Sequence, residues 1–164
     1  MRGYGFVDGH AQFAAAKPPI DPCAIFAALE GAGVAELYPD FRGWFFGKVV
    51  HGLRSGERCI APWTIDGTLA GVAICKRTET ERKLSTLWVC SEARDRGIAA
   101  KLARDAFVWL GTSQPLFTVP EERAAEFDGL VQSWSFPKAV AYQGLYRAGR
   151  VEYVFNGPIK GNAH

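Results

Sequence analysis

Apolar side chains at helical spacing predict two amphipathic helices in the first third of the chain. The first helix is predicted to begin at Asp21-Pro22, because aspartate caps free backbone N–H groups and proline suits the first helical position. It is predicted to end near Gly31. The second is predicted to run from Pro39-Asp40 to about Leu53. Four apolar side chains share one face of this second helix: Phe41, Trp44, Phe45 and Val49.

Apolar runs bounded by turn residues predict strands in the middle of the chain. Arg58–Ile65 and Leu69–Lys76 flank Asp66-Gly67, a dipeptide typical of two-residue hairpin turns. Lys83–Cys90 carries apolar side chains at alternate and intervening positions, which predicts a strand buried on both faces. A further short strand is predicted at Gln12–Ala16.

Helices and strands alternate in the remainder of the chain. A helix is predicted from Ile98 to Gly111, followed by a short buried strand at Leu116–Val119. Pro120 is predicted to occupy the first position of another helix, which Phe136-Pro137 ends. Two strands, Ala139–Tyr146 and Val151–Phe155, are predicted as a final hairpin.

The order of these elements is β-α-α-β-β-β-α-β-α-β-β, which predicts an α/β fold of the mixed α+β kind. Its central sheet is expected to be mixed and mostly antiparallel, with helices packed on it. Residues 1–11, glycine-rich and without periodicity, are interpreted as a lead-in segment. Residues 12–164 are interpreted as a single domain, in agreement with a length of 164 residues.

Composition and charge exclude several classes of function. Nineteen basic and 17 acidic side chains leave a net charge of +2, which does not favour binding to nucleic acid or to an anionic membrane. No apolar stretch is long enough to span a membrane, and no apolar segment follows Arg2 to suggest a secretion signal. We therefore expect a cytoplasmic protein with no membrane partner.

The spacing of cysteines and histidines does not favour a metal site. The cysteines lie at least 15 residues apart and form no C-x-x-C pair, and the three histidines are scattered. A domain of this size also needs no disulfide to be stable. We expect reduced thiols and no metal at Cys23, Cys59, Cys75 and Cys90.

The segment between the predicted strand Lys83–Cys90 and the helix that begins at Ile98 carries the clearest chemical signal. Its pattern is Arg94-x-x-Gly97-x-Ala99, a polar turn that leads directly into a helix. Backbone N–H groups at a helix start bind anions, and small side chains let a pyrophosphate approach them. Residues 76–105 also carry eight basic and five acidic side chains, a local net charge of +3.

This strand–turn–helix segment resembles the coenzyme-binding segment of the GNAT superfamily of N-acetyltransferases, whose pattern there is R/Q-x-x-G-x-G/A. The order of the neighbouring elements is similar as well, so the resemblance covers roughly Gln12 to Phe155. It implies a GNAT-like fold and an acetyl group taken from acetyl-CoA, with no metal. The resemblance implies that the backbone and side chains of Leu87, Trp88, Val89, Arg94, Asp95, Arg96, Gly97, Ile98, Ala99 and Ala100 bind this coenzyme.

The catalytic residues follow less directly from the resemblance. In many family members a tyrosine acts as the general acid, and Val131 occupies its position here. A carboxylate base on the central strand is also absent, because Lys83–Cys90 contains no Asp or Glu. The candidate bases are therefore the nearest carboxylates, Glu79 and Glu81, in the loop before that strand. Substitutes for the acid are Ser133, Tyr142 and Tyr146.

Three functions are compatible with these residues. The first is transfer of an acetyl group from acetyl-CoA to an amine, of a small molecule or a protein, by direct attack in a ternary complex. The second is a domain that binds acyl-CoA with little turnover, as a sensor or interaction module. The third is a toxin-like or modification enzyme acting on a charged tRNA or a protein amine. A homodimer is left open.

Overall fold

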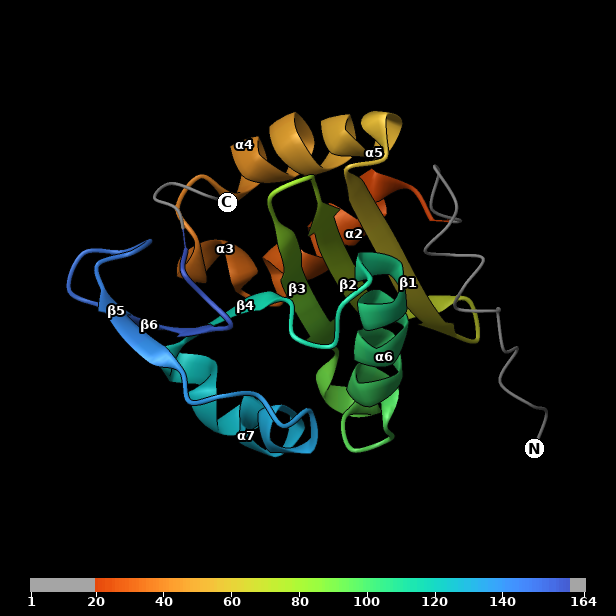
Figure 1. Ribbon diagram of the computed structural model, residues 1–164. Coiled ribbons are helices and arrows are strands. Elements are labelled where there is room, and N and C mark those ends of the chain that lie inside the picture. Colours follow the sequence, from red (N-terminus) through yellow and green to blue (C-terminus); the bar gives the residue numbers. More distant parts are fainter. Residues whose placement is uncertain (1–19, 160–164) are drawn as a thin grey trace.

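An open six-stranded sheet forms the centre of the part of the chain that the structure describes (Figure 1). The computed structural model describes residues 20–159, so the lead-in segment and the predicted strand Gln12–Ala16 lie outside the described residues. Only the contact between β3 and β4 is parallel, which confirms the mixed, mostly antiparallel sheet. In spatial order the strands are β1 (Arg58–Ile65), β2 (Thr68–Arg77), β3 (Arg82–Val89), β4 (Leu116–Pro120), β6 (Val151–Phe155) and β5 (Val140–Gln143).

Helices cover both faces of the sheet (Figure 1). The N-terminal helices lie on one face and α6 (Ile98–Leu110) on the other, while α7 (Ala124–Ser133) packs beside β4. The Asp21 side chain accepts a hydrogen bond from the Cys23 amide, so the first helix begins as predicted. The N-terminal helices are α2 (Pro22–Gly31), α3 (Val34–Leu37), α4 (Phe41–Trp44), the π-helical turn η1 (Phe45–Val50) and α5 (His51–Ser55).

Two hydrophobic cores result from the alternation of side chains along the strands. On β2, Val72 and Ile74 pack against the N-terminal helices, whereas Ala73 and Cys75 pack against α6. Successive side chains of a strand point to opposite faces, so one apolar strand contributes to both cores. The small side chains on the α6 side let this helix approach the sheet closely.

One close approach is decisive for the position of α6. A Cβ atom at Gly71 would lie 3.0 Å from the Trp88 carbonyl oxygen and 3.3 Å from a methyl group of Leu102. Any larger residue would crowd both the sheet and the helix at this point. The start of α6 is thereby held next to the end of β3.

Strands β3 and β4 separate soon after they pair. Lys83 lies opposite Leu116 and Leu84 opposite Phe117, and no further pair follows. The register with β2 shifts at the same place, because Thr86 and Leu84 pair with consecutive residues and Ser85 between them has no partner. Such a bulge bends a strand, and here it turns β3 away from β4. One edge of β3 is therefore left without a neighbouring strand from Ser85 onward.

The end of the chain differs from the prediction in two places. Strand β5 ends at Gln143, and Tyr146 lies in the following loop, so its predicted place on a strand is wrong. The chain turns at Gly144, which has a φ of +73° and whose amide donates to the Arg150 carbonyl at 2.8 Å. Pro120 is the last residue of β4, paired with Glu152, and not the first residue of a helix. The short 3-10 helices η2 (Ser91–Ala93) and η3 (Glu121–Arg123) precede α6 and α7.

Candidate active site

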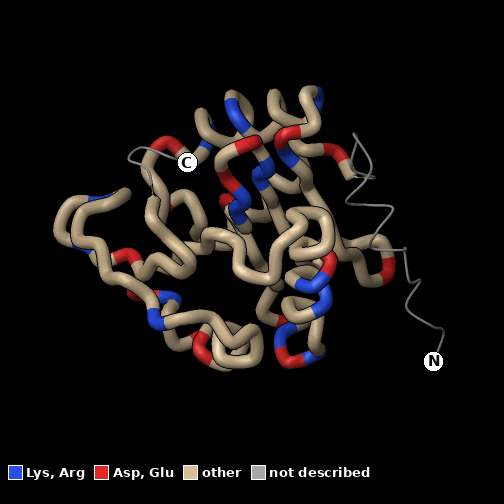
Figure 2. The backbone as a smooth tube through the Cα atoms, viewed as in Figure 1, with Lys and Arg blue, Asp and Glu red and all other residues tan. Residues whose placement is uncertain are grey.

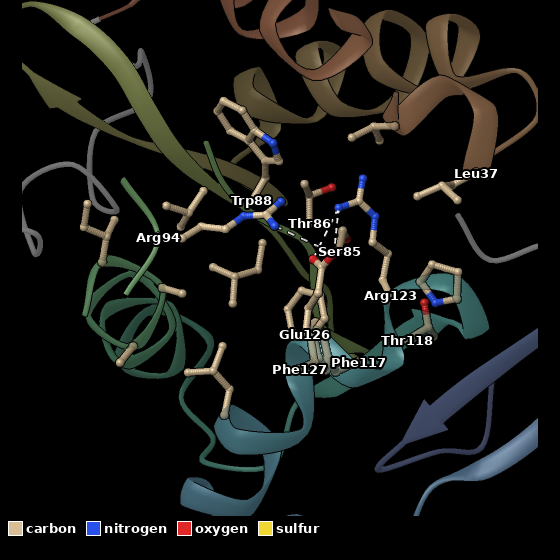
Figure 3. A pocket seen from close by; sticks show the side chains of 18 of the residues that line it. Leu37, Ser85, Thr86, Trp88, Arg94, Phe117, Thr118, Arg123, Glu126 and Phe127 are labelled. Carbon is tan, nitrogen blue, oxygen red and sulfur yellow. Dashed lines mark hydrogen bonds and ion pairs between the residues drawn. The ribbon is translucent and has the colours of Figure 1, made fainter. Parts of the chain in front are cut away.

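A cavity of about 420 Å³ fills the space between the separated strands β3 and β4 (Figure 3). One end lies at the turn before α6, and the other end is bounded by α3 and Tyr38. The edge of β3 from Ser85 to Val89 forms one wall. The opposite wall comes from β4 and α7, including Phe117 and Phe127. The cavity therefore extends from the predicted anion site at the start of α6 to α3 and Tyr38.

The structure brings most of the predicted coenzyme-binding residues together around this cavity. Nine of the ten line it, and Arg96 is the exception, an exposed side chain on the outside of the turn. Basic and acidic positions are mixed in this turn (Figure 2). The nine lining residues are Leu87, Trp88, Val89, Arg94, Asp95, Gly97, Ile98, Ala99 and Ala100.

The first residue positions of α6 are open to a ligand. Gly97 occupies the N-cap with a φ of +76°, and no side chain caps the helix there. A Cβ atom at Gly97 would meet nothing within 4 Å, so the space next to the helix start is empty. The first N–H groups of a helix have no partner within it and lie at the positive end of its dipole. This geometry suits a phosphate group.

Two arginines hold a shared carboxylate across the cavity (Figure 3). Glu126 of α7 accepts a hydrogen bond from Arg123 at 3.2 Å and lies 3.9 Å from Arg94. All three side chains are partly exposed, and such ion pairs contribute about 0–1 kcal/mol. Arg94 and Arg123 can therefore turn towards an anionic ligand at little cost.

A group of buried and half-buried polar side chains lies at the other end of the cavity. We call Tyr38, Lys83, Thr118, Tyr146 and Glu152 the Glu152 cluster. The Tyr38 hydroxyl donates to Glu152 Oε1 at 3.1 Å, and Lys83 Nζ donates to the Tyr146 hydroxyl at 3.3 Å. The two tyrosine rings meet edge to face, with their centroids 5.4 Å apart. Glu152 is 3% exposed and Lys83 is 1% exposed.

Burial changes the acidity of the groups in this cluster. It raises the pKa of Glu152 to about 7, although hydrogen bonds with Thr118 and Tyr38 favour the ionised form. Burial lowers the pKa of Lys83 to about 8, and it raises the pKa of Tyr146 to about 12. The pKa of Tyr38 is raised well above its ordinary value by burial and by the Glu152 carboxylate. A carboxyl group with a pKa near neutrality is suited to proton transfer.

The loop that carries Tyr146 is tied to the rest of the fold. Arg147 donates two hydrogen bonds of 2.8 Å to the two carboxylate oxygens of Glu122 in η3. This contact lowers the pKa of Glu122 to about 2 and raises that of Arg147. The Val151 amide donates to Glu121 Oε1 at 3.3 Å. These contacts hold the loop against the start of α7, next to the cluster.

Comparison with known proteins settles the family. A family model described as the acetyltransferase (GNAT) family matches residues 23–125. The chain belongs to the GNAT acetyltransferase family. No curated protein matches it by sequence. Solved structures resemble the GNAT fold seen here at low sequence identity, so they bear on the fold alone.

Three of these structures illustrate the degree of similarity in fold and sequence. A protein from Desulfovibrio desulfuricans, described as of the GNAT family, has a TM-score of 0.57 and 15% identity over 84% of this chain and 91% of its own. The ribosomal-protein-S18-alanine N-acetyltransferase from Escherichia coli has a TM-score of 0.51 and 18% identity, over 66% and 75%. The acetyltransferase from Bacillus subtilis, in complex with CoA, has a TM-score of 0.50 and 12% identity, over 63% and 78%.

The predicted catalytic residues of this GNAT chain are dispersed. Glu79 is exposed, and Glu81 is paired with Lys76 at 2.8 Å. The Ser133 hydroxyl donates to the Leu130 carbonyl of its own helix. Tyr142 lies on β5 opposite Glu152. None of these four is among the described residues that line the cavity, whereas Tyr146 belongs to the Glu152 cluster.

Sequence reasoning missed four members of the Glu152 cluster. They are Tyr38, Lys83, Thr118 and Glu152, which come from four separate segments. One signal was present: Glu152 and Val154 share a face of β6, so the pattern places an acid on an apolar, inward face. A buried carboxylate needs a partner, and its partner Tyr38 is 114 residues away.

Among residues 20–159, no group of three or more His, Cys, Asp or Glu side chains is placed to hold a metal ion. No helix in this part of the chain is long and apolar enough to cross a bilayer. All four cysteines are free, and burial raises the pKa of Cys59 and of Cys75.

Proposed function

We propose that this GNAT chain transfers an acetyl group from acetyl-CoA to an amine by direct attack in a ternary complex. The observation that carries the proposal is that one continuous cavity joins the uncapped start of α6 to the Glu152 cluster. An anion site at one end and polar hydroxyls at the other are what a thioester donor and an amine acceptor require. The matched GNAT family supports acetyl transfer as the reaction.

The coenzyme would lie along the open edge of β3. The N–H groups of Ile98, Ala99 and Ala100 would hold the pyrophosphate, with Arg94 nearby. Leu87–Val89 lines the cavity and has no strand paired to its edge on the β4 side, so its backbone would pair there with the amides of the pantetheine arm. The thioester would then point towards Ser85 and Thr118.

The acceptor would enter from the side of α3, where Val34 and Leu37 line the cavity. In the reaction the neutral amine nitrogen attacks the thioester carbonyl carbon, a C–N bond forms and the C–S bond breaks. The thiolate of CoA leaves and is protonated, and the nitrogen loses one proton. Apolar walls at this end favour an amine carried on an apolar group.

A second candidate function is acyl-CoA binding with little turnover. The observation that favours it is Val131, which occupies the place of the family's acidic tyrosine. In the structure Val131 lines a separate pocket between α7 and β6 and not the cavity described above. Neither this apolar side chain nor its position therefore supplies an acid for the leaving thiolate.

Calorimetric titration and thiol release separate the two functions. We expect the purified protein to bind acetyl-CoA and to release CoA steadily with at least one member of an amine panel. Tight binding without release from any amine would favour the second function. Absence of binding to both acetyl-CoA and CoA would refute both functions.

A pair of glycine variants locates the coenzyme. Gly97→Glu places bulk and negative charge at the start of α6, and we expect it to abolish acetyl-CoA binding. Gly56→Glu is the matched control, because Gly56 has a φ of +78° against +76° at Gly97 and open space around it. Both variants carry the same backbone strain. Equal binding by both variants would show that the coenzyme lies elsewhere.

A further inference from the structure

The Glu152 carboxylate is connected to the cavity through hydroxyl groups. Glu152 itself does not line the cavity, but Tyr38 and Thr118 do, and both are hydrogen bonded to it. Tyr38 follows α3, Thr118 is on β4 and Glu152 is on β6, so three elements converge on this contact. An acceptor amine in the cavity would therefore meet Tyr38 and Thr118 before it reached the carboxylate.

Resting on the proposed amine acetylation, we propose that Glu152 takes up the proton that the acceptor ammonium loses before it attacks the thioester, and that the Tyr38 hydroxyl passes this proton from the cavity to the carboxylate. In this step an N–H bond of the substrate ammonium breaks and a bond from its proton to Tyr38 Oη forms. The Tyr38 O–H bond breaks, and that proton joins Glu152 Oε1. The products are a neutral amine, an unchanged tyrosine and a protonated Glu152.

The hydrogen bond between Tyr38 and Glu152 already has the direction that this step needs. The phenol donates to the carboxylate at 3.1 Å, so its own oxygen can accept a proton as the first one leaves. Tyr38 keeps its proton otherwise, since burial and the facing carboxylate raise its pKa well above the ordinary value. Glu152 does not touch the substrate: it accepts the proton through Tyr38 and acts by way of this side chain.

Charged and polar groups on the neighbouring elements shift the pKa of the Glu152 carboxylate. Lys83 on β3 and Arg147 in the β5–β6 loop face it with positive charge and lower its pKa, and burial outweighs both. Thr118 on β4 donates a hydrogen bond to it, and Lys83 donates one to the Tyr146 hydroxyl. A pKa of about 7 makes Glu152 both ionised and basic enough to accept a proton near neutral pH.

The pH dependence of kcat/KM tests the proposal. We use a primary alkylamine acceptor, whose own pKa near 10 leaves the region near pH 7 to the protein. For the wild-type protein we expect a limb that rises through about pH 7. Glu152→Gln should lower kcat about a hundredfold or more and remove that limb, while acetyl-CoA binding is unchanged. Tyr38→Phe should lower kcat similarly, because it breaks the connection.

Two further variants separate proton transfer from a structural effect. Lys83→Met removes a positive charge that lowers the pKa of Glu152, so the limb should move to higher pH. Tyr153→Phe makes the same change as Tyr38→Phe on the other face of β6, next to Glu152, and should leave the profile unchanged. If Glu152→Gln does not fold, the profiles of Tyr38→Phe and Lys83→Met decide.

The possible failures are distinguishable. A wild-type protein that releases no CoA with any amine overturns the proposed function and this inference together. A wild-type protein that transfers acetyl groups while Glu152→Gln keeps its limb near pH 7 overturns this inference alone. An unmoved limb in Lys83→Met also counts against it, because Lys83 then does not act on the titrating group.

Discussion

Ionisation of the buried Glu152 carboxylate should weaken the fold, and Glu152→Gln measures by how much. Burial raises the pKa of Glu152 from its ordinary 4.5 to about 7. At about 1.36 kcal/mol per pKa unit, this difference corresponds to about 3 kcal/mol. Because the pKa is higher in the folded chain, Glu152 contributes this amount to the free energy of unfolding when it is protonated. The stabilisation is fully present below pH 4.5 and is lost as the pH rises through about 7. Glutamine keeps an oxygen for the Tyr38 hydroxyl but does not ionise.

We therefore expect Glu152→Gln to gain about 3 kcal/mol of unfolding free energy relative to wild type between about pH 4 and about pH 8. Urea titrations followed by tryptophan fluorescence measure it, since the chain contains five tryptophans. Taking the difference between the two proteins cancels the groups that titrate in both. Glu30→Gln, at an exposed position of α2, is the control for the chemical change itself. A difference that does not vary with pH would refute the buried, ionisable carboxylate.

Three other predictions follow from burial and contacts. Phe45 is completely buried, so Phe45→Ala should lower the unfolding free energy by about 3–5 kcal/mol, whereas Val108→Ala, at an exposed helix position, should change it by under about 0.5 kcal/mol; thermal and urea denaturation compare them. Cys23 is exposed and Cys75 buried, so a thiol reagent should modify Cys23 rapidly in the native protein and Cys75 only on unfolding, as peptide mapping would show. Ser133→Ala should leave CoA release unchanged, because the hydroxyl is bonded within its own helix; a tenfold loss would restore Ser133 as a candidate acid.

Local sequence was enough to predict most of the sheet. Asp66 and Gly67 both have positive φ, 51° and 80°, and they join β1 and β2 in the hairpin that this dipeptide predicts. The boundaries of β1 agree with the prediction at both ends. Turn residues and strand alternation are properties of a few neighbouring residues, so they can be recognised without the rest of the chain.

Elements that depend on distant contacts were not predicted. The four-residue helix α3 has no apolar periodicity of its own, and it becomes one wall of the cavity through its place in the fold. Tyr146 is predicted at the end of a strand, but the turn at Gly144 takes it into a loop. The bulge at Ser85, which separates β3 from β4, depends on the pairing with β2.

The two ends of the candidate site also differ in whether local sequence or distant contacts determine them. The coenzyme end is one continuous stretch, Leu87 to Ala100, in which a strand end, an arginine, a glycine and a helix start follow one another. Its chemistry depends on backbone N–H groups and small side chains, which the local order of residues determines. For that reason the sequence by itself determined the family resemblance and the predicted anion site.

Only the tertiary structure decided the other end. The Glu152 cluster joins residues as far apart as Tyr38 and Glu152, and it contains no motif. Its chemistry depends on burial, because removing a carboxylate from water is what raises its pKa towards neutrality. Burial is a property of the packed fold and not of any segment, so the sequence identifies Glu152 only as an acid on an apolar strand.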